Sequence, residues 1–125
     1  MTDRRPAPST GRLGVLLPGM GAVASTFIAG VLAARRGLTA PIGSLSQMAR
    51  LGGADDGPLI REAVPLAALD DLVFGGWDPI TTNVLEAART AGVLSNEHLA
   101  PIADELAAIE PMPAVFDRRW VSRLD

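Results

Sequence analysis

The chain has 125 residues, of which 48% are hydrophobic and 20% charged, and this is the size and composition of one globular domain with a buried core. It has no cysteine, which excludes disulfides and cysteine nucleophiles, and all eleven basic residues are arginine, which excludes Schiff-base lysines. The net charge of -3 without a basic cluster argues against nucleic acid as a partner, and no apolar run has the roughly 20 residues that span a membrane.

The first forty residues predict an arm, a strand, a turn and a helix. Residues 1–10 hold arginines and prolines without an apolar stretch, and we expect a flexible N-terminal arm. The apolar run 13–17 predicts a strand buried on both faces of a parallel sheet. Two glycines follow, and 22–36 predict a helix. Its apolar positions at helical spacing are Val23, Phe27, Val31 and Leu32, and Gly37 is expected to cap it.

The middle of the chain has weaker patterns. Residues 41–45 predict a second strand, the glycine-rich and proline-rich segment 52–58 predicts a loop, and 65–71 predict a short helix. The apolar residues 72–74 predict a third strand, which the segment 75–79 ends.

The last third predicts two helices and a strand. Asp78 as N-cap and Pro79 as first helical residue predict a helix to about residue 91, ended by Gly92. Ser95 is expected to cap a further helix to about residue 109, with Pro101 near its first turn or interrupting it. Residues 114–116 predict another strand.

Strands that alternate with helices predict right-handed β-α-β units. The expected fold class is therefore α/β, a Rossmann-like doubly wound parallel sheet that is incomplete, in one domain over residues 11–125.

Residues 19–24, GMGAVA, match the pattern G-x-G-x-x-G/A between a predicted strand and a predicted helix. The first glycine permits a tight turn, the second lets the backbone approach a diphosphate, and the small last residue lets helix and strand pack closely. Free N–H groups at the helix start favour an anion, with Ser25 and Thr26 as further hydroxyl donors. The alternative is a glycine-rich turn that only reverses the chain.

The acidic residue that would hold a ribose about 20 positions further on is missing, because 41–45 contain no Asp or Glu. Ser44 or Ser46 could bond a ribose instead, and Arg50 could meet a 2′-phosphate, so the spacing leaves NAD and NADP open. Asp78 ends a predicted strand, where ligands of open parallel sheets bind, and could contact a ribose or only cap a helix.

The other residues with potentially reactive or metal-binding side chains are expected to have structural roles. Asp55 and Asp56 have no third nearby ligand, so no metal site is expected. His98 is interpreted as a surface or capping residue, and Trp77 and Trp120 as packing residues.

Three further segments follow the glycine turn in order: PIGSLSQMARLG, PLIREAVPLAALDDLVFGGWD and PMPAVFD. Together with the turn they resemble the myo-inositol-1-phosphate synthase family, also called inositol-3-phosphate synthase, from about Gly11 to the last residue. The resemblance implies an NAD-dependent isomerase that converts glucose 6-phosphate to 1D-myo-inositol 3-phosphate, for inositol and phospholipid biosynthesis. The implied steps are oxidation at C5, intramolecular aldol cyclisation and re-reduction by the same cofactor. It also implies a Rossmann NAD domain joined to a catalytic and tetramerisation domain, a homotetramer and a cytoplasmic location.

The resemblance also implies roles for particular residues. It assigns the phosphate-binding turn to Gly19, Met20, Gly21, Ala22 and Val23. Asp78 matches an aspartate that contacts NAD in the family. The turn departs from the GG-N-N-G form of the eukaryotic members, which affects the details of the diphosphate contacts.

The catalytic and substrate-binding lysines of the family lie further along its chains, and this chain has no lysine. Cyclisation through an enolate needs cationic groups and a general acid or base. We therefore expect residues 11–125 to be the N-terminal part of an NAD-binding domain, without a catalytic residue and inactive alone.

The alternative is a non-enzymatic nucleotide-binding or assembly module. A short dehydrogenase is disfavoured because tyrosine and lysine are both absent. An incomplete sheet leaves an unpaired edge and an uncovered apolar face, so self-association is expected.

Overall fold

A computed structural model describes residues 7–8, 10–53, 55–115, 117 and 119. It contains two compact units. We call Val15–Ala29 with Phe74–Asp125 the glycine-turn unit, and Met1–Gly14 with Gly30–Val73 the short-helix unit. Among the described residues, no helix has the length and apolar character needed to cross a membrane.

The strand, turn and helix expected at the start of the chain are present. Strand β1 covers Leu13–Pro18 and helix α1 covers Ala22–Arg35. Gly37 ends the helix as expected: its φ is 66°, and its N–H donates to the carbonyl of Ala34 at 3.0 Å. This left-handed backbone at the helix end favours glycine, because a side chain there would be strained.

The sheet has the order β1-β2-β3 and its strands are parallel, which confirms the expected α/β class and the incomplete Rossmann-like sheet. Strand β2 covers Leu72–Asp78, and β3 covers Met112–Pro113, with Trp77 opposite Met112. The prediction that β2 ends at Phe74 is wrong, because the two glycines after it continue the strand. The strand predicted at 114–116 is instead the shorter β3, and residue 116 lies outside the described residues.

Helix α4 covers Val84–Ala91, so the predicted start at Pro79 is wrong. Asn83 is the N-cap, and its side-chain oxygen accepts the N–H of Glu86 at 3.0 Å. Asp78 does not cap this helix, because its carboxylate bonds elsewhere. Gly92, with a φ of 63°, ends α4 as expected.

The helix expected after Ser95 is broken into three pieces. Helix α5 covers Asn96–Leu99, the 3₁₀ turn η3 covers Ala100–Ile102, and α6 covers Ala103–Ala107. The Ser95 cap is confirmed, since its hydroxyl accepts the N–H of His98. Pro101 lies in η3, where its missing N–H and its ring interrupt an α-helix.

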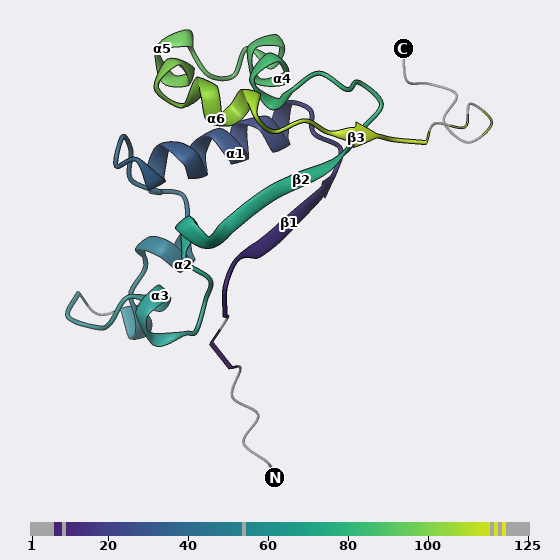
Figure 1. The fold of residues 1–125 in the computed structure, drawn as a ribbon. Coiled ribbons are helices and arrows are strands. Elements are labelled where there is room, and N and C mark those ends of the chain that lie inside the picture. The colour runs from purple at the N-terminus through teal and green to yellow at the C-terminus, as the bar shows by residue number, and fades with distance from the viewer. Residues whose placement is uncertain (1–6, 9, 54, 116, 118, 120–125) are drawn as a thin grey trace. The chain divides into compact units, whose positions relative to one another are not determined.

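Figure 1 shows α4, α5 and α6 on the same side of the strands as α1. Apolar residues from these helices form the core of the glycine-turn unit; the largest fully buried ones are Ile28, Val84, Leu99, Ile102 and Leu106. The predicted apolar face of α1 is partly wrong, because Val23 is 86% exposed and Phe27 45%. Val31 and Leu32 are buried as predicted, and the buried face also contains Ala24, Ser25, Ile28 and Ala29.

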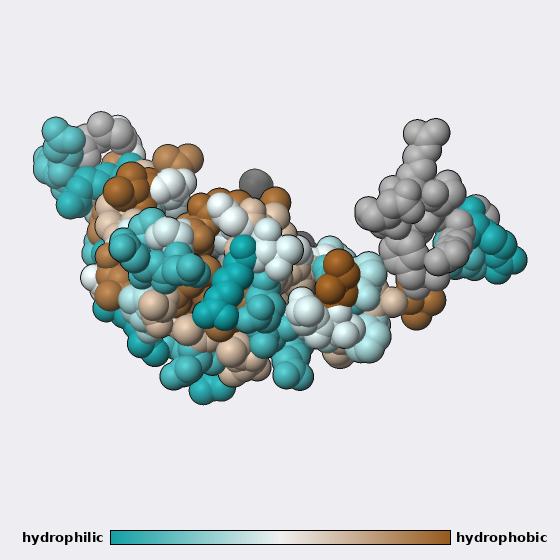
Figure 2. All heavy atoms as spheres, turned by 90° about the horizontal axis from the view of Figure 1, so that it is seen from above, coloured by the Kyte–Doolittle hydropathy of each residue, from teal (hydrophilic) through white to brown (hydrophobic). Residues whose placement is uncertain are grey.

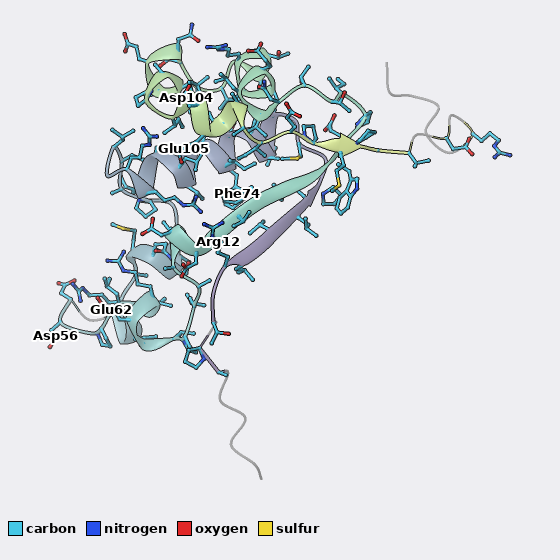
Figure 3. The ribbon with its side chains drawn as sticks, viewed as in Figure 1. Arg12, Asp56, Glu62, Phe74, Asp104 and Glu105 are labelled. Carbon is cyan, nitrogen blue, oxygen red and sulfur yellow. The ribbon has the colours of Figure 1, made fainter. Side chains whose placement is uncertain are left out.

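One face of the sheet lacks such a cover among the described residues. Leu16 in β1 is 62% exposed, so the expectation that this strand is buried on both faces is wrong. The ring of Phe74 in β2 packs edge-to-face on Phe27 of α1, with centroids 5.6 Å apart, and Figure 3 shows it on the helix side of the strand. The helices therefore cover the face that carries Phe74.

The short-helix unit holds α2 (Leu45–Met48), the 3₁₀ turn η1 (Leu51–Gly53), α3 (Ile60–Ala63) and the 3₁₀ turn η2 (Leu69–Asp71). The strand predicted at 41–45 is wrong, because these residues form turns that lead into α2. The helix predicted at 65–71 is reduced to η2.

Backbone and arginine contacts organise this unit. Arg50 and Leu59 form an antiparallel bridge across the predicted glycine-rich loop. The guanidinium of Arg35, at the end of α1, donates to the carbonyls of Leu69, at 2.7 Å, and Leu72. The arginine thereby ties the end of α1 to the segment that enters β2.

Candidate functional site

The turn between β1 and α1 is fixed to the end of β2 by its backbone. Gly19 has a φ of 101°, a conformation that L side chains rarely adopt, and its N–H donates to the carbonyl of Trp77 at 2.7 Å. The chain therefore reverses where the carboxyl ends of two neighbouring parallel strands meet. Ligands of open α/β sheets bind at this edge.

Asp78 is the second link between the turn and β2. One carboxylate oxygen, Oδ2, accepts the N–H of Met20 at 2.7 Å, and the other, Oδ1, accepts the N–H of Ile80 at 2.8 Å. Hydrogen bonds from N–H groups to a carboxylate are among the stronger ones in proteins. The aspartate thus holds both the glycine turn and the first residues after β2 in place, a role different from the predicted helix cap.

Gly76 permits this close approach of the two strand ends. A Cβ at this position would lie 2.9 Å from the carbonyl carbon of Leu17, closer still to its oxygen, and 3.0 Å from Sδ of Met20. Two of these atoms belong to backbone and cannot move aside. The prediction that residues 75–79 end the strand misses this role of Gly76, although a pair of glycines inside an apolar run is itself a sign of close backbone approach.

The N-terminus of α1 faces solvent. Gly21, Ala22 and Val23 are exposed, and no acidic residue occupies the first turn. The first intrahelical bond runs from the N–H of Ser25 to the carbonyl of Gly21 at 2.9 Å. Within the described part of the chain no acceptor is recorded for the N–H groups of residues 21–23, as expected at a helix start. Three donors and the positive end of the helix dipole are therefore available to an anion.

The expected hydroxyl donors are used inside the helix. Ser25 is 0% exposed, and its hydroxyl lies 3.2 Å from the carbonyl of Ala22, to which it donates. The hydroxyl of Thr26 donates to the same carbonyl at 2.7 Å. Both hydroxyls are therefore engaged within the helix, and the donors left at the turn are backbone N–H groups.

Ser44 belongs to the short-helix unit. It precedes α2 without capping it through its side chain, and its hydroxyl lies 3.1 Å from that of Ser46. Arg50, the predicted partner of a 2′-phosphate, donates to the carbonyl of Gly57 at 2.5 Å. The structure brings Met20 and Asp78 together. The contact of Ser44 with a ribose stays a prediction.

The remaining candidates have local roles. His98 is exposed and its Nδ1 lies 3.1 Å from the hydroxyl of Ser95, which confirms its interpretation as a surface or capping residue. Asp55 and Asp56 are exposed, and Figure 3 shows Asp56 at the outer tip of its loop. Among the described residues no group of three acidic or histidine side chains is placed to bind a metal. Trp77 is 38% exposed rather than packed in the core, and Trp120 lies outside the described residues.

Comparison with known proteins identifies the family. The family model described as myo-inositol-1-phosphate synthase, which represents an NAD-binding domain, matches residues 13–125. The chain belongs to the myo-inositol-1-phosphate synthase family. An inositol-3-phosphate synthase 1 from Bacteroides thetaiotaomicron is 52% identical over 120 residues, which are 94% of this chain and 28% of that protein.

More distant inositol-3-phosphate synthases also match this chain. Inositol-3-phosphate synthase 1 from Rattus norvegicus is 36% identical over 94% of this chain and 24% of its own length. The crystal structure of inositol-3-phosphate synthase from Caenorhabditis elegans superposes with a TM-score of 0.69 at 22% identity, over 87% of this chain and 25% of that one, and shows the same fold. The chain spans about a quarter of the length of the relatives it matches.

NAD is the cofactor of this family's domain. The residues of this chain fit a dinucleotide, because the exposed N–H groups of residues 21–23 meet no acidic side chain in the first turn of α1. A Cβ at Gly21 would have no atom within 4 Å, so the space beside this glycine is open to a ligand. The backbone donors at the start of α1 are therefore suited to the diphosphate of a dinucleotide.

Proposed function

We propose that this chain is the NAD-binding part of an inositol-3-phosphate synthase and is inactive alone. The observation that carries the proposal is the exposed start of α1 beside the Met20 to Asp78 hydrogen bond, in a chain of this family. The reaction of the whole enzyme would convert glucose 6-phosphate to 1D-myo-inositol 3-phosphate, an isomerisation that supplies inositol and phospholipid biosynthesis. We propose a homotetramer for the whole enzyme and the cytoplasm for its location, since a chain without cysteine suits a reducing compartment.

In this proposal the residues of the turn bind the diphosphate of NAD. The N–H groups of Gly21, Ala22 and Val23 would donate to its oxygens, while Gly19 supplies the φ that the turn requires. Met20 is 2% exposed, so its side chain anchors the turn in the core, and its N–H stays with Asp78.

Asp78 has a second proposed role toward the cofactor. Each carboxylate oxygen can accept more than one hydrogen bond, so a ribose hydroxyl could share Asp78 with the two backbone donors. Ser44 is a proposed partner of a ribose, on the spacing argument alone. Bound NAD would supply a hydride acceptor and donor for oxidation and re-reduction of the substrate.

The catalytic groups are proposed to lie in another part of the enzyme. Aldol cyclisation needs cations to stabilise developing negative charge and a group that moves protons. Three of the described arginines are engaged in local contacts: Arg35 and Arg50 bond backbone carbonyls, and Arg89 pairs with Glu86 at 2.9 Å. This use of the cations supports a binding role for the chain and leaves the chemistry to the rest of a synthase.

The test is a calorimetric titration of the purified chain with NAD and then with NADP. We expect saturable binding of NAD at one site, and binding that is lost in Gly21→Asp, because the new carboxylate would occupy the anion site. A folded chain that binds neither nucleotide would contradict the proposal. Binding without any effect of Gly21→Asp would place the nucleotide somewhere other than the glycine turn.

A further inference from the structure

Two hydroxyl groups converge on one carbonyl in the first turn of α1. The hydroxyl of Ser25 donates to the carbonyl oxygen of Ala22 at 3.2 Å, and the hydroxyl of Thr26 donates to the same oxygen at 2.7 Å. Ser25 is 0% exposed, and a buried hydroxyl is costly unless it has a hydrogen-bond partner. An alanine at this position would fill the core without needing a partner, so packing alone does not explain the serine.

The carbonyl of Ala22 belongs to the same peptide group as the N–H of Val23. Resonance couples the two ends of a peptide group, and hydrogen bonds in a chain polarise one another. A donor on the carbonyl of Ala22 therefore makes the N–H of Val23 a stronger donor. This N–H is one of the three at the start of α1 that find no acceptor among the described residues, and Val23 is 86% exposed.

We propose that Ser25 and Thr26 are positioning residues that strengthen the N–H of Val23 as a donor to the diphosphate of NAD. This inference rests on the proposed function. The two hydroxyls act through the peptide group between them and the anion, without touching the anion. They also offset the partial negative charge of the Ala22 oxygen, which would otherwise oppose an anion at the start of the helix.

The test compares Ser25→Ala and Thr26→Val, singly and together, with the unchanged chain. Valine has the shape of threonine and alanine is close to serine in size, so each change deletes a hydroxyl and little else. In NMR spectra without ligand, the carbonyl carbon of Ala22 and the amide nitrogen of Val23 should move upfield, because their peptide group is less polarised. In calorimetry the dissociation constant for NAD should rise about twofold for each hydroxyl and about fourfold in the double variant.

Two control variants separate the hydroxyl from the shape of the side chain. Thr26→Ser keeps the hydroxyl and should keep the resonances and the NAD affinity of the unchanged chain. Thr90→Val deletes an exposed hydroxyl inside α4 and should change neither. Seen from the side of α4, α5 and α6, the surface is a mixture of hydrophilic and scattered hydrophobic residues (Figure 2), as is usual for a solvated face. Urea unfolding shows that each variant is folded.

Three outcomes would overturn the proposal. They are resonances that stay in place in the double variant, an NAD affinity that this variant leaves unchanged, and a loss of affinity that is equal in Thr26→Ser and Thr26→Val. The resonances are measured without NAD, so the two proposals can be told apart. A folded chain whose resonances move but which binds no NAD supports the polarised peptide and contradicts only the proposed function. A chain that binds NAD equally well in all variants contradicts only the role of the hydroxyls.

Discussion

The carboxylate of Asp78 accepts the N–H of Met20 at 2.7 Å, so the last residue of β2 holds the turn that follows β1. These residues are 58 positions apart, and the bond is part-buried. The second carboxylate oxygen accepts the N–H of Ile80, so one side chain orders both chain segments at the proposed cofactor edge. The position of the glycine turn therefore depends on a residue outside the glycine motif.

Replacing Asp78 should lower the free energy of unfolding, and the loss should be larger with alanine than with asparagine. Asp78→Asn keeps one acceptor oxygen and turns an amide group toward the other N–H, and we expect a loss of about 1 kcal/mol in the free energy of unfolding. Asp78→Ala removes both acceptors and should cost about 2 kcal/mol. Both should weaken NAD binding, because the turn is no longer held. Urea unfolding and calorimetry measure the two effects.

Asp56→Asn is the control for the change in charge. Asp56 is exposed at the tip of its loop (Figure 3), and its replacement should leave stability and NAD binding unchanged. Equal stability of all three variants would show that the Asp78 bonds do not hold the turn.

Local patterns in the sequence account for much of the fold. The apolar run before Gly19, the G-x-G-x-x-A spacing and Gly37 predict β1, the turn and α1 to within a residue at each end. Ser95 and Gly92 likewise mark a helix start and a helix end at their observed places. These features succeed because each depends on the backbone conformation of a few neighbouring residues.

Other features depend on contacts between distant segments, and here local patterns fail. Asp78 followed by proline matches the pattern of a helix N-cap. Its carboxylate instead accepts the N–H groups of Met20 and Ile80, and α4 begins five residues later than predicted. Gly76 would ordinarily predict the end of a strand. In the structure it lies within β2, where the absence of a side chain allows the backbone of Leu17 to lie close. The exposure of Leu16 is also visible only in the tertiary structure, because burial of β1 on both faces requires a covering layer that no local pattern reveals.

Gly76→Ala should be strongly destabilising. Its Cβ would lie 2.9 Å from the carbonyl carbon of Leu17, so β1 and β2 must separate, and we expect a cost of about 3 kcal/mol or more. Gly75→Ala is the matched control, because its nearest atom is Cδ2 of Leu16 at 3.8 Å, an ordinary contact. The control should lie within about 1 kcal/mol of the unchanged chain. Thermal and urea unfolding of both variants measure this, and similar losses in the two would refute the close approach.

Gly21→Asp should separate stability from binding. Position 21 precedes α1, where aspartate is a preferred N-cap, so the free energy of unfolding should be unchanged or raised by about 0.5 kcal/mol. The same carboxylate should weaken NAD binding by at least about a hundredfold through repulsion of the diphosphate. Ser95→Asp is the control, since it adds the same charge at the N-cap of α5 and should leave NAD binding as it is. A variant that loses binding only because it unfolds would show the role of Gly21 to be structural.

The purified chain should release no inositol phosphate from glucose 6-phosphate in the presence of NAD. The chain has no lysine, and Arg35, Arg50 and Arg89 are engaged in local bonds, so the part of the chain that the structure describes offers no cluster that could stabilise an enolate and move its proton. Activity should appear only when the rest of a synthase is present, and Gly21→Asp should then abolish it. The measurement is phosphorylated inositol formed per chain, with and without the partner polypeptide. Turnover by the chain alone would place catalytic residues within these 125 positions and refute the division of labour proposed for this family member.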